Sequence, residues 1–313
     1  TPGGGVTAPV IRVDRAGSPE SWAGVDANGA VVLMDTSSLR AAALAFRHGA
    51  VGVLTDECGR PDGPRDAYRF LNYTISPNAV NKGFGFGLTE ARGSRLRAAL
   101  DTYGDGAVFV HAHVDSRLYE GTVPVVTGLL PGETDEEVVV TGHLCEPGAN
   151  DNVSGPALAV EAARSLRALA EAGRIRPLKR GIRLCHTYEV RGTNAYVSEH
   201  GAGRLTVAGI NLDMVARRQT NHVFRTTSSL PGYTDALLLD LLRRGQSSSE
   251  LADHDYGLVD DNIFGEPLVG APCPGLVQYQ DPTWHTSADT MAGIDADVLA
   301  MNGAVAVAYC AAI

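Results

Sequence analysis

Hydrophobic residues recur along the chain at two spacings, which predict alternating strands and helices. Residues 30–56 contain the apolar run AVVLMD, the helical pattern SSLRAAALAFRHG and a second apolar run, AVGVLTD. Ser37 or Ser38 suits a helix N-cap, and Gly49 suits the end of that helix. A polar, Gly/Pro-rich stretch follows, and the segment TEARGSRLRAAL predicts another helix. Residues 1–105 are therefore expected to form a small α/β module.

From residue 106 onward, strand and helix patterns alternate to the end of the chain. Strands are expected at VFVHAHVD, VPVVTGLLPG, EEVVVTGHL, RGIRLCHTYE, LTVAGINLDMV and LVGAPCPGLVQY. Helices are expected over residues 155–172, 192–201, 234–245 and 295–312. Such alternation implies a mixed, mostly parallel sheet with helices on both faces. We assign residues 106–313 to a second, catalytic domain.

Composition and charge narrow the class of partner. The chain has 44% hydrophobic residues and a formal net charge of -10, and it has no sustained basic cluster. This argues against nucleic acids and anionic membranes as partners, because both are bound by lysine and arginine. No apolar run reaches the roughly 18 residues of a membrane helix, and the N-terminus lacks the features of a signal peptide. The five cysteines suggest no disulfide framework, so a cytoplasmic location is expected.

Acidic and imidazole side chains follow several of the predicted strands. In sheets of this kind, ligands bind beyond the carboxyl ends of the strands, so side chains placed there are candidates for function. One further carboxylate lies in the turn TGHLCEPGANDNVSG, which joins a buried strand to the long helix at 155–172. The five candidates are His143, Asp151, Glu189, Asp213 and His285.

Two imidazoles and three carboxylates form the ligand set that zinc accepts. The set is too large for one four-coordinate zinc with an open position, and it suits two ions that share one carboxylate and activate a water for hydrolysis. Asp151 is the natural bridge because it lies in the tight turn. Gly148 and Ala149 allow close approach of the backbone, and Asn150 and Asn152 can bond to the backbone of the turn. Each residue alone also has an ordinary structural explanation, such as a helix cap or a surface histidine.

The segments GHLCEPGANDNVSG, YEVRGTNAY, NLDMV and HTSADT occur in an order that resembles the zinc-dependent exopeptidase superfamily. The resemblance is to its aminopeptidases with two co-catalytic zincs, and more specifically to a bacterial aminopeptidase-like branch. It covers residues 106–313, and residues 1–105 resemble the protease-associated module of such proteins. By position, it implies that His143 and Asp213 hold one metal, that Glu189 and His285 hold the other, and that Asp151 bridges them.

One departure from that family leaves the general base open. Its better-known members have two adjacent glutamates at the third motif, whereas this chain has Tyr188 followed by Glu189. Either Glu189 is the base and one metal lacks a ligand, or Glu189 is a ligand and the base lies elsewhere. Glu146, three residues after His143, is a candidate base, and a solvated turn residue is the alternative explanation. Because Glu189 is either a ligand or the base, the sequence also does not decide whether the site holds one zinc or two.

Other residues of the second domain have weaker assignments. Asp260 and Asp261 could line the substrate site or form a solvated acidic turn. Tyr279 and Trp284 could form walls of the pocket or pack into the core. We reject Cys145 as a nucleophile activated by His143, because no third group is expected to orient that histidine.

The sequence therefore predicts a metal-dependent amide hydrolase, an aminopeptidase that acts on small peptides or aminoacyl amides. A deacylase of N-acyl or natural-product amides is an alternative, because the same activated water cleaves any amide. A metal-poor binding module is another, suggested by the missing second glutamate. The sequence does not predict the oligomeric state.

Overall fold

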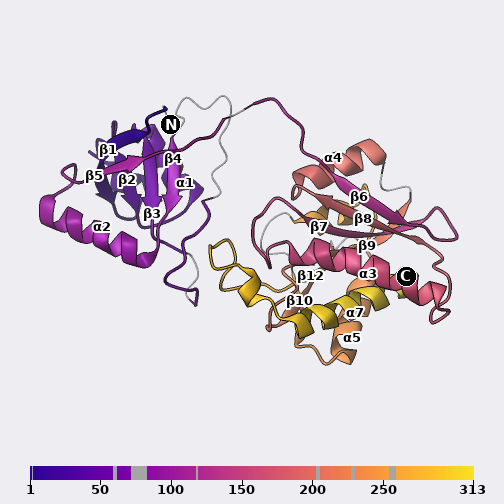
Figure 1. Cartoon of the computed structure of the whole chain (residues 1–313). Coiled ribbons are helices and arrows are strands. Elements are labelled where there is room, and N and C mark those ends of the chain that lie inside the picture. The colour runs from indigo at the N-terminus through magenta and orange to yellow at the C-terminus, as the bar shows by residue number, and fades with distance from the viewer. Residues whose placement is uncertain are drawn as a thin grey trace. The chain divides into compact units, whose positions relative to one another are not determined.

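The computed structural model describes residues 1, 3–58, 62–71, 83–117, 119–201, 205–226, 230–253 and 259–313, with Asp261 and Asn262 as backbone only. The chain forms two compact units (Figure 1). The first contains Thr1–Gly121 and His285–Ala288, and the second contains Thr122–Trp284 and Asp289–Ile313. No helix among these residues is long and apolar enough to cross a membrane.

The first unit contains a five-stranded sheet in the order β4-β3-β2-β1-β5. All neighbouring pairs are parallel except β1 and β5, which are antiparallel. The strands are β1 (Val6–Val13), β2 (Val31–Met34), β3 (Gly52–Thr55), β4 (Phe84–Gly87) and β5 (Phe109–Ala112). The helical segments are η1 (Pro19–Trp22), α1 (Leu39–Arg47) and α2 (Glu90–Tyr103).

The predicted elements of the first unit are present, with one change of partner. The Ser38 side chain caps α1, as expected, by accepting a hydrogen bond from the backbone N–H of Ala41. The strand expected at 108–115 was assigned to the second domain, but it forms β5 and pairs with β1. The two units divide after Gly121 rather than at the predicted boundary after residue 105. Alternation predicts a strand but does not indicate its partner.

The second unit contains a seven-stranded sheet in the order β11-β10-β12-β9-β7-β8-β6. The central strands β12, β9, β7 and β8 are parallel, whereas β6 and β10 run antiparallel to their neighbours β8 and β12. The strands are β6 (Val126–Leu130), β7 (Glu137–His143), β8 (Gly181–Thr187), β9 (Thr206–Asp213), β10 (Asn221–Phe224), β11 (Ser249–Ala252) and β12 (Gly275–Val277). The mixed, mostly parallel sheet predicted from the sequence is confirmed.

Helices cover both faces of this sheet. Side chains of α3 (Ser154–Glu171), α5 (Tyr233–Arg244) and α7 (Ala296–Ala312) pack with Val138 and Val140 of β7 on one face. Side chains of α4 (Arg191–His200) and α6 (Asp260–Gly265) pack with Val139 on the other. Successive residues of a strand point to opposite faces, which explains why the whole of β7 is buried and why Val138, Val139 and Val140 are all apolar.

Candidate metal centre

Three predicted ligands lie at the carboxyl ends of neighbouring parallel strands. His143 is the last residue of β7, Asp213 is the last residue of β9, and Glu189 follows the end of β8 by two residues. Because β9, β7 and β8 are adjacent, these ends meet at one edge of the sheet. His143 and Asp213 are buried, with 2% and 6% of their surface exposed.

Both ring nitrogens of His143 face carboxylates. Nε2 lies 3.3 Å from Oδ1 of Asp151 and 4.0 Å from Oε2 of Glu146. Nδ1 lies 3.3 Å from Oδ2 of Asp260. A histidine that ligates a metal through one nitrogen usually presents the other to a carboxylate, which fixes the ring and its tautomer. In this arrangement Nε2 is the nitrogen available to a metal, and Asp260 orients the ring.

Asp260 is fixed from several sides at the start of α6. Its Oδ1 accepts hydrogen bonds from the backbone N–H of Val190, at 3.0 Å, and from the hydroxyl of Thr193, at 2.7 Å. Burial alone would raise the pKa of Asp260, but His143, Thr193 and Val190 together lower it below its ordinary value. A fully buried carboxylate with these partners does not suit the predicted contact with substrate, and it positions His143 instead. The Asp261 side chain lies outside the described residues.

The turn after β7 is held by a carboxylate that the sequence analysis missed. Asp289 accepts hydrogen bonds from the backbone N–H groups of Asn150, at 2.9 Å, and Asp151, at 2.8 Å. Its charge is balanced by Arg217, whose guanidinium lies 3.1 Å from Asp289 and 2.7 Å from Asp281. Asp289 lies within the quoted segment HTSADT, so that motif could have drawn attention to it. No signal in the sequence pointed to Arg217.

The polar residues of the turn bond to the end of β9 as well as to the turn itself. The Asn150 side chain accepts from the N–H of Ala216, and the Asn152 side chain bonds to the backbone of Leu212 and Met214. A Cβ atom at Gly148 would overlap Asp289 and the carbonyl of Asp151. The small residues therefore allow the close backbone approach that was expected, and the turn is tight. It brings the carboxylate of Asp151 next to the ring of His143.

The cluster concentrates negative charge in a buried place. Burial, followed by the charges of Asp151, Glu189 and Asp260, raises the pKa of Asp213 well above its ordinary value despite the opposing effect of His143. Burial is also the largest cause that raises the pKa of Glu189 to about 7. Burial lowers the pKa of His143, but the surrounding carboxylates outweigh this and raise it well above its ordinary value.

These charges fit a bound cation. Oδ1 of Asp213 is buried and has no hydrogen-bond partner among the residues that the structure describes. An unpaired buried carboxylate is costly unless a cation compensates it. His143, Glu146 and Asp151 offer one nitrogen and two carboxylate oxygens within 4.8 Å of one another. Imidazole and carboxylate together suit zinc and related divalent ions.

The remaining predicted residues have other contacts in the structure. His285 belongs to the first unit, where its carbonyl accepts a hydrogen bond of 2.8 Å from the N–H of Phe70. Its role as a ligand beside Glu189 stays a prediction. Tyr279 and Trp284 are half-buried and contact each other with ring centroids 5.4 Å apart. They pack beside Phe224 in a small apolar cluster, and their contact with substrate also stays a prediction.

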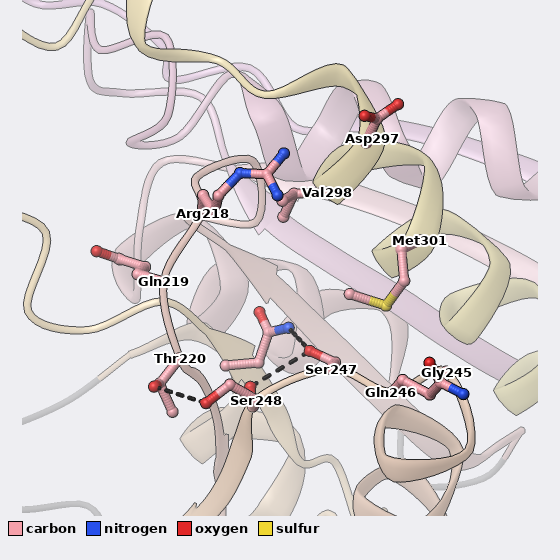
Figure 2. A pocket seen from close by; sticks show the side chains of 11 residues that line it. Arg218, Gln219, Thr220, Gly245, Gln246, Ser247, Ser248, Asp297, Val298 and Met301 are labelled. Atoms are coloured by element: carbon pink, nitrogen blue, oxygen red, sulfur yellow. Dashed lines mark hydrogen bonds between the residues drawn. The ribbon is translucent and has the colours of Figure 1, made fainter.

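A separate open pocket of about 430 Å³ lies where α5 ends, α7 begins and β10 begins (Figure 2). Most of the residues that line it are of polar type, and the hydroxyls of Thr220 and Ser248 form a hydrogen bond there. None of the predicted metal ligands lines it. The lining residues are Arg218, Gln219, Thr220, Asn221, Gly245, Gln246, Ser247, Ser248, Asp297, Val298 and Met301.

Comparison with known proteins identifies relatives of this chain. The sequence profile of Peptidase family M28 matches residues 97–310. A protein of Clostridium acetobutylicum, provisionally named a polysaccharide biosynthesis protein with an aminopeptidase-like domain, is 25% identical over 193 residues. That alignment covers 60% of this chain and 42% of the relative. The chain thus spans less than half the length of this curated relative.

Two solved structures share the fold over nearly the whole chain. The Peptidase M28 precursor from Shewanella amazonensis SB2B has a TM-score of 0.68 and 18% identity, over 99% of this chain and 74% of that one. The aminopeptidase from Aneurinibacillus sp. strain AM-1 has a TM-score of 0.58 and 19% identity, over 100% of this chain and 75% of that one. At these identities the likeness shows the fold. The profile match extends over more than half of the sequence, and the chain belongs to Peptidase family M28.

Proposed function

We propose that the chain is a metal-dependent amide hydrolase, an aminopeptidase that acts on small peptides or aminoacyl amides with one or two zinc ions. The observation that carries the proposal is the cluster of His143, Glu146 and Asp151 at the end of β7, next to Asp213 and Glu189. Family membership supports a peptidase. The buried negative charge supports a divalent cation.

His143, Asp151 and Asp213 would hold one ion, and Glu189 would hold a second or act as base. A divalent cation, when bound, supplies Lewis-acid polarisation of a substrate carbonyl and makes water more acidic. The protein contributes the orientation of these groups. Asp260 fixes the ring of His143, and Asp289 fixes the backbone that carries Asp151.

The proton transfers are assigned to carboxylates of the same cluster. Glu189 is the first candidate for the general base, because its half-buried carboxylate lies beside His143, Glu146 and Asp151. Glu146 is the second candidate, since its carboxylate belongs to the same ligand group. Substitution of Glu189 or of Glu146, followed by reloading with zinc, would separate the role of metal ligand from the role of base. Loss of a ligand lowers the zinc content, whereas loss of a base alone does not.

The experiment compares the parent with Asp213→Asn and with Asp240→Asn, a control at an exposed position on α5 that pairs with Arg244. We expect the parent to bind zinc, to hydrolyse leucyl-p-nitroanilide and to lose this activity with chelator. Asp213→Asn should lose at least about 100-fold in activity together with zinc, because the buried ligand charge is gone. Hydrolysis of N-blocked substrates alone would favour the deacylase. A parent that binds no metal would contradict the proposal.

A further inference from the structure

Asp281 is a buried carboxylate of the second unit that the proposed function does not use. It lies in the loop after β12, and 1% of its side chain is exposed. A buried charge is costly unless it is paired and hydrogen-bonded. The partners of Asp281 come from three segments, which are the turn after β7, the loop after β9 and its own loop. The position of this carboxylate therefore affects how those segments meet.

Both oxygens of Asp281 face hydrogen-bond donors. Oδ2 accepts a bond of 2.8 Å from the side-chain amide of Asn150 and lies 2.7 Å from Nε of Arg217. Oδ1 accepts two bonds from Thr283, at 2.6 Å from the backbone N–H and at 2.7 Å from the hydroxyl. A carboxylate accepts on both oxygens at once, whereas an asparagine amide would turn an NH₂ group toward one of these donors. The contacts therefore suit aspartate and disfavour asparagine.

The bond to Asn150 connects Asp281 to the turn that carries Asp151. Asn150 is fully buried and directly precedes Asp151. Its NH₂ group donates to Asp281, while its side-chain oxygen accepts a bond of 3.0 Å from the N–H of Ala216. The first partner only accepts and the second only donates, so the orientation of the amide is determined. Asp281 thus fixes the side chain that ties the turn to the loop after β9.

Arg217 links Asp281 to the second carboxylate that holds the turn. Its guanidinium pairs with Asp281 and with Asp289, which lies 3.1 Å away and accepts the backbone N–H of Asp151. One cation therefore compensates two buried carboxylates. The turn is held at its backbone by Asp289 and at the side chain of Asn150 by Asp281. Polar networks of this kind are strong when every member has its partner, and they weaken as a unit when one is lost.

We infer that Asp281 is a positioning residue for the proposed metal ligand Asp151. It acts through Asn150 and Arg217, and neither these two residues nor Thr283 is a predicted ligand. The inference rests on the proposed function, since it assumes that Asp151 binds metal. Groups that orient a ligand usually change metal affinity by about 10- to 100-fold. The loss of Asp281 should therefore weaken metal binding more than it alters the reaction of the loaded enzyme.

The test compares the parent with Asp281→Asn and with the exposed control Asp240→Asn. Competition with a chromophoric chelator gives the dissociation constant for zinc. We expect Asp281→Asn to bind zinc about 10- to 100-fold more weakly than the parent, and Asp240→Asn to bind it equally well. At saturating zinc, kcat of Asp281→Asn for leucyl-p-nitroanilide should return to within about threefold of the parent, because Asp281 touches neither metal nor substrate.

Urea denaturation of the metal-free proteins shows whether each variant is folded and how stable it is. Thr283→Val is the second variant, which keeps Asp281 and removes one of its donors. It should lower zinc affinity by at least about twofold, a change within the range of one hydrogen bond, and it serves alone if Asp281→Asn does not fold. A loss of stability with unchanged zinc affinity would overturn the inference and leave the proposed function standing. A parent that binds no metal would overturn both.

Discussion

At the scale of single residues, the pair of His143 and Asp260 decides how the candidate centre presents its imidazole. Asp260, on α6, is itself fixed by Val190, in the loop after β8, and by Thr193, on α4. Three elements therefore act together to orient the ring of His143. A carboxylate that holds a ligand histidine in this way usually changes the metal affinity without binding the metal itself.

Asp260→Asn should weaken zinc binding by about 10- to 100-fold, because the amide keeps the shape of the side chain but loses the charge that orients His143. The dissociation constant can be measured by competition with a chromophoric chelator. Asp240→Asn should bind zinc as the parent does. Equal affinities in Asp260→Asn and the parent would show that the contact between Asp260 and His143 has no role in metal binding.

The sequence predicted the residues at the strand ends better than the residues that support them. His143, Glu189 and Asp213 could be found because each follows an apolar strand, and the fold rule places strand ends together. Arg217 and Asp289 could not be found this way. They are 72 residues apart, and only the folded chain shows that together they hold the turn carrying Asp151.

At the scale of elements, the junction between the turn and α3 depends on close backbone contact. Gly155 is the second residue of α3, and a Cβ atom there would overlap the carbonyl of Leu212 at the end of β9. The contact holds the helix against the strand that carries Asp213. A backbone carbonyl cannot rotate away as a side chain can.

Gly155→Ala should destabilise the protein by about 1–3 kcal/mol, because the helix must move away from β9 to make room. The free energy of unfolding can be measured by urea denaturation. Gly128→Ala in β6 is the control, since a Cβ atom there would meet only the Leu184 side chain at ordinary contact distances of 3.9 Å or more. A variant at Gly155 as stable as this control would contradict the expected overlap.

The long helices were predictable, whereas several short elements were not. α3 and α7 have 18 and 17 residues, long enough for the helical spacing to be evident. β10 and β11 have four residues each, and α6 has six, too few for a clear period. Asp260 lies on α6, which explains why its place beside His143 could not be inferred from the sequence.

At the scale of the whole molecule, buried thiols make the free energy of unfolding depend on pH in the alkaline range. Burial raises the pKa of Cys185 and Cys310 from 9.0 to about 12. In the unfolded chain these thiols ionise near pH 9, while the folded chain keeps them protonated. Between these values the unfolded state binds fewer protons, so stability is intact below pH 9 and falls as the pH rises toward 12.

Each thiol should contribute a loss of about 1.4 kcal/mol per pH unit in that window. Guanidinium denaturation of the parent and of Cys310→Ala at a series of alkaline pH values isolates the effect. The variant should be less stable throughout because of the cavity, but its stability should fall less steeply with pH. Equal slopes would show that Cys310 does not titrate on unfolding.

The division of the chain into two units has a consequence for dissecting the protein. The polypeptide passes from the first unit to the second after Gly121, returns for His285–Ala288 and leaves again at Asp289. In the first unit, this short return pairs with Tyr68, Arg69 and Phe70. A fragment that begins at Thr122 would carry residues 285–288 without those partners, so the second unit cannot be excised intact by a single cut.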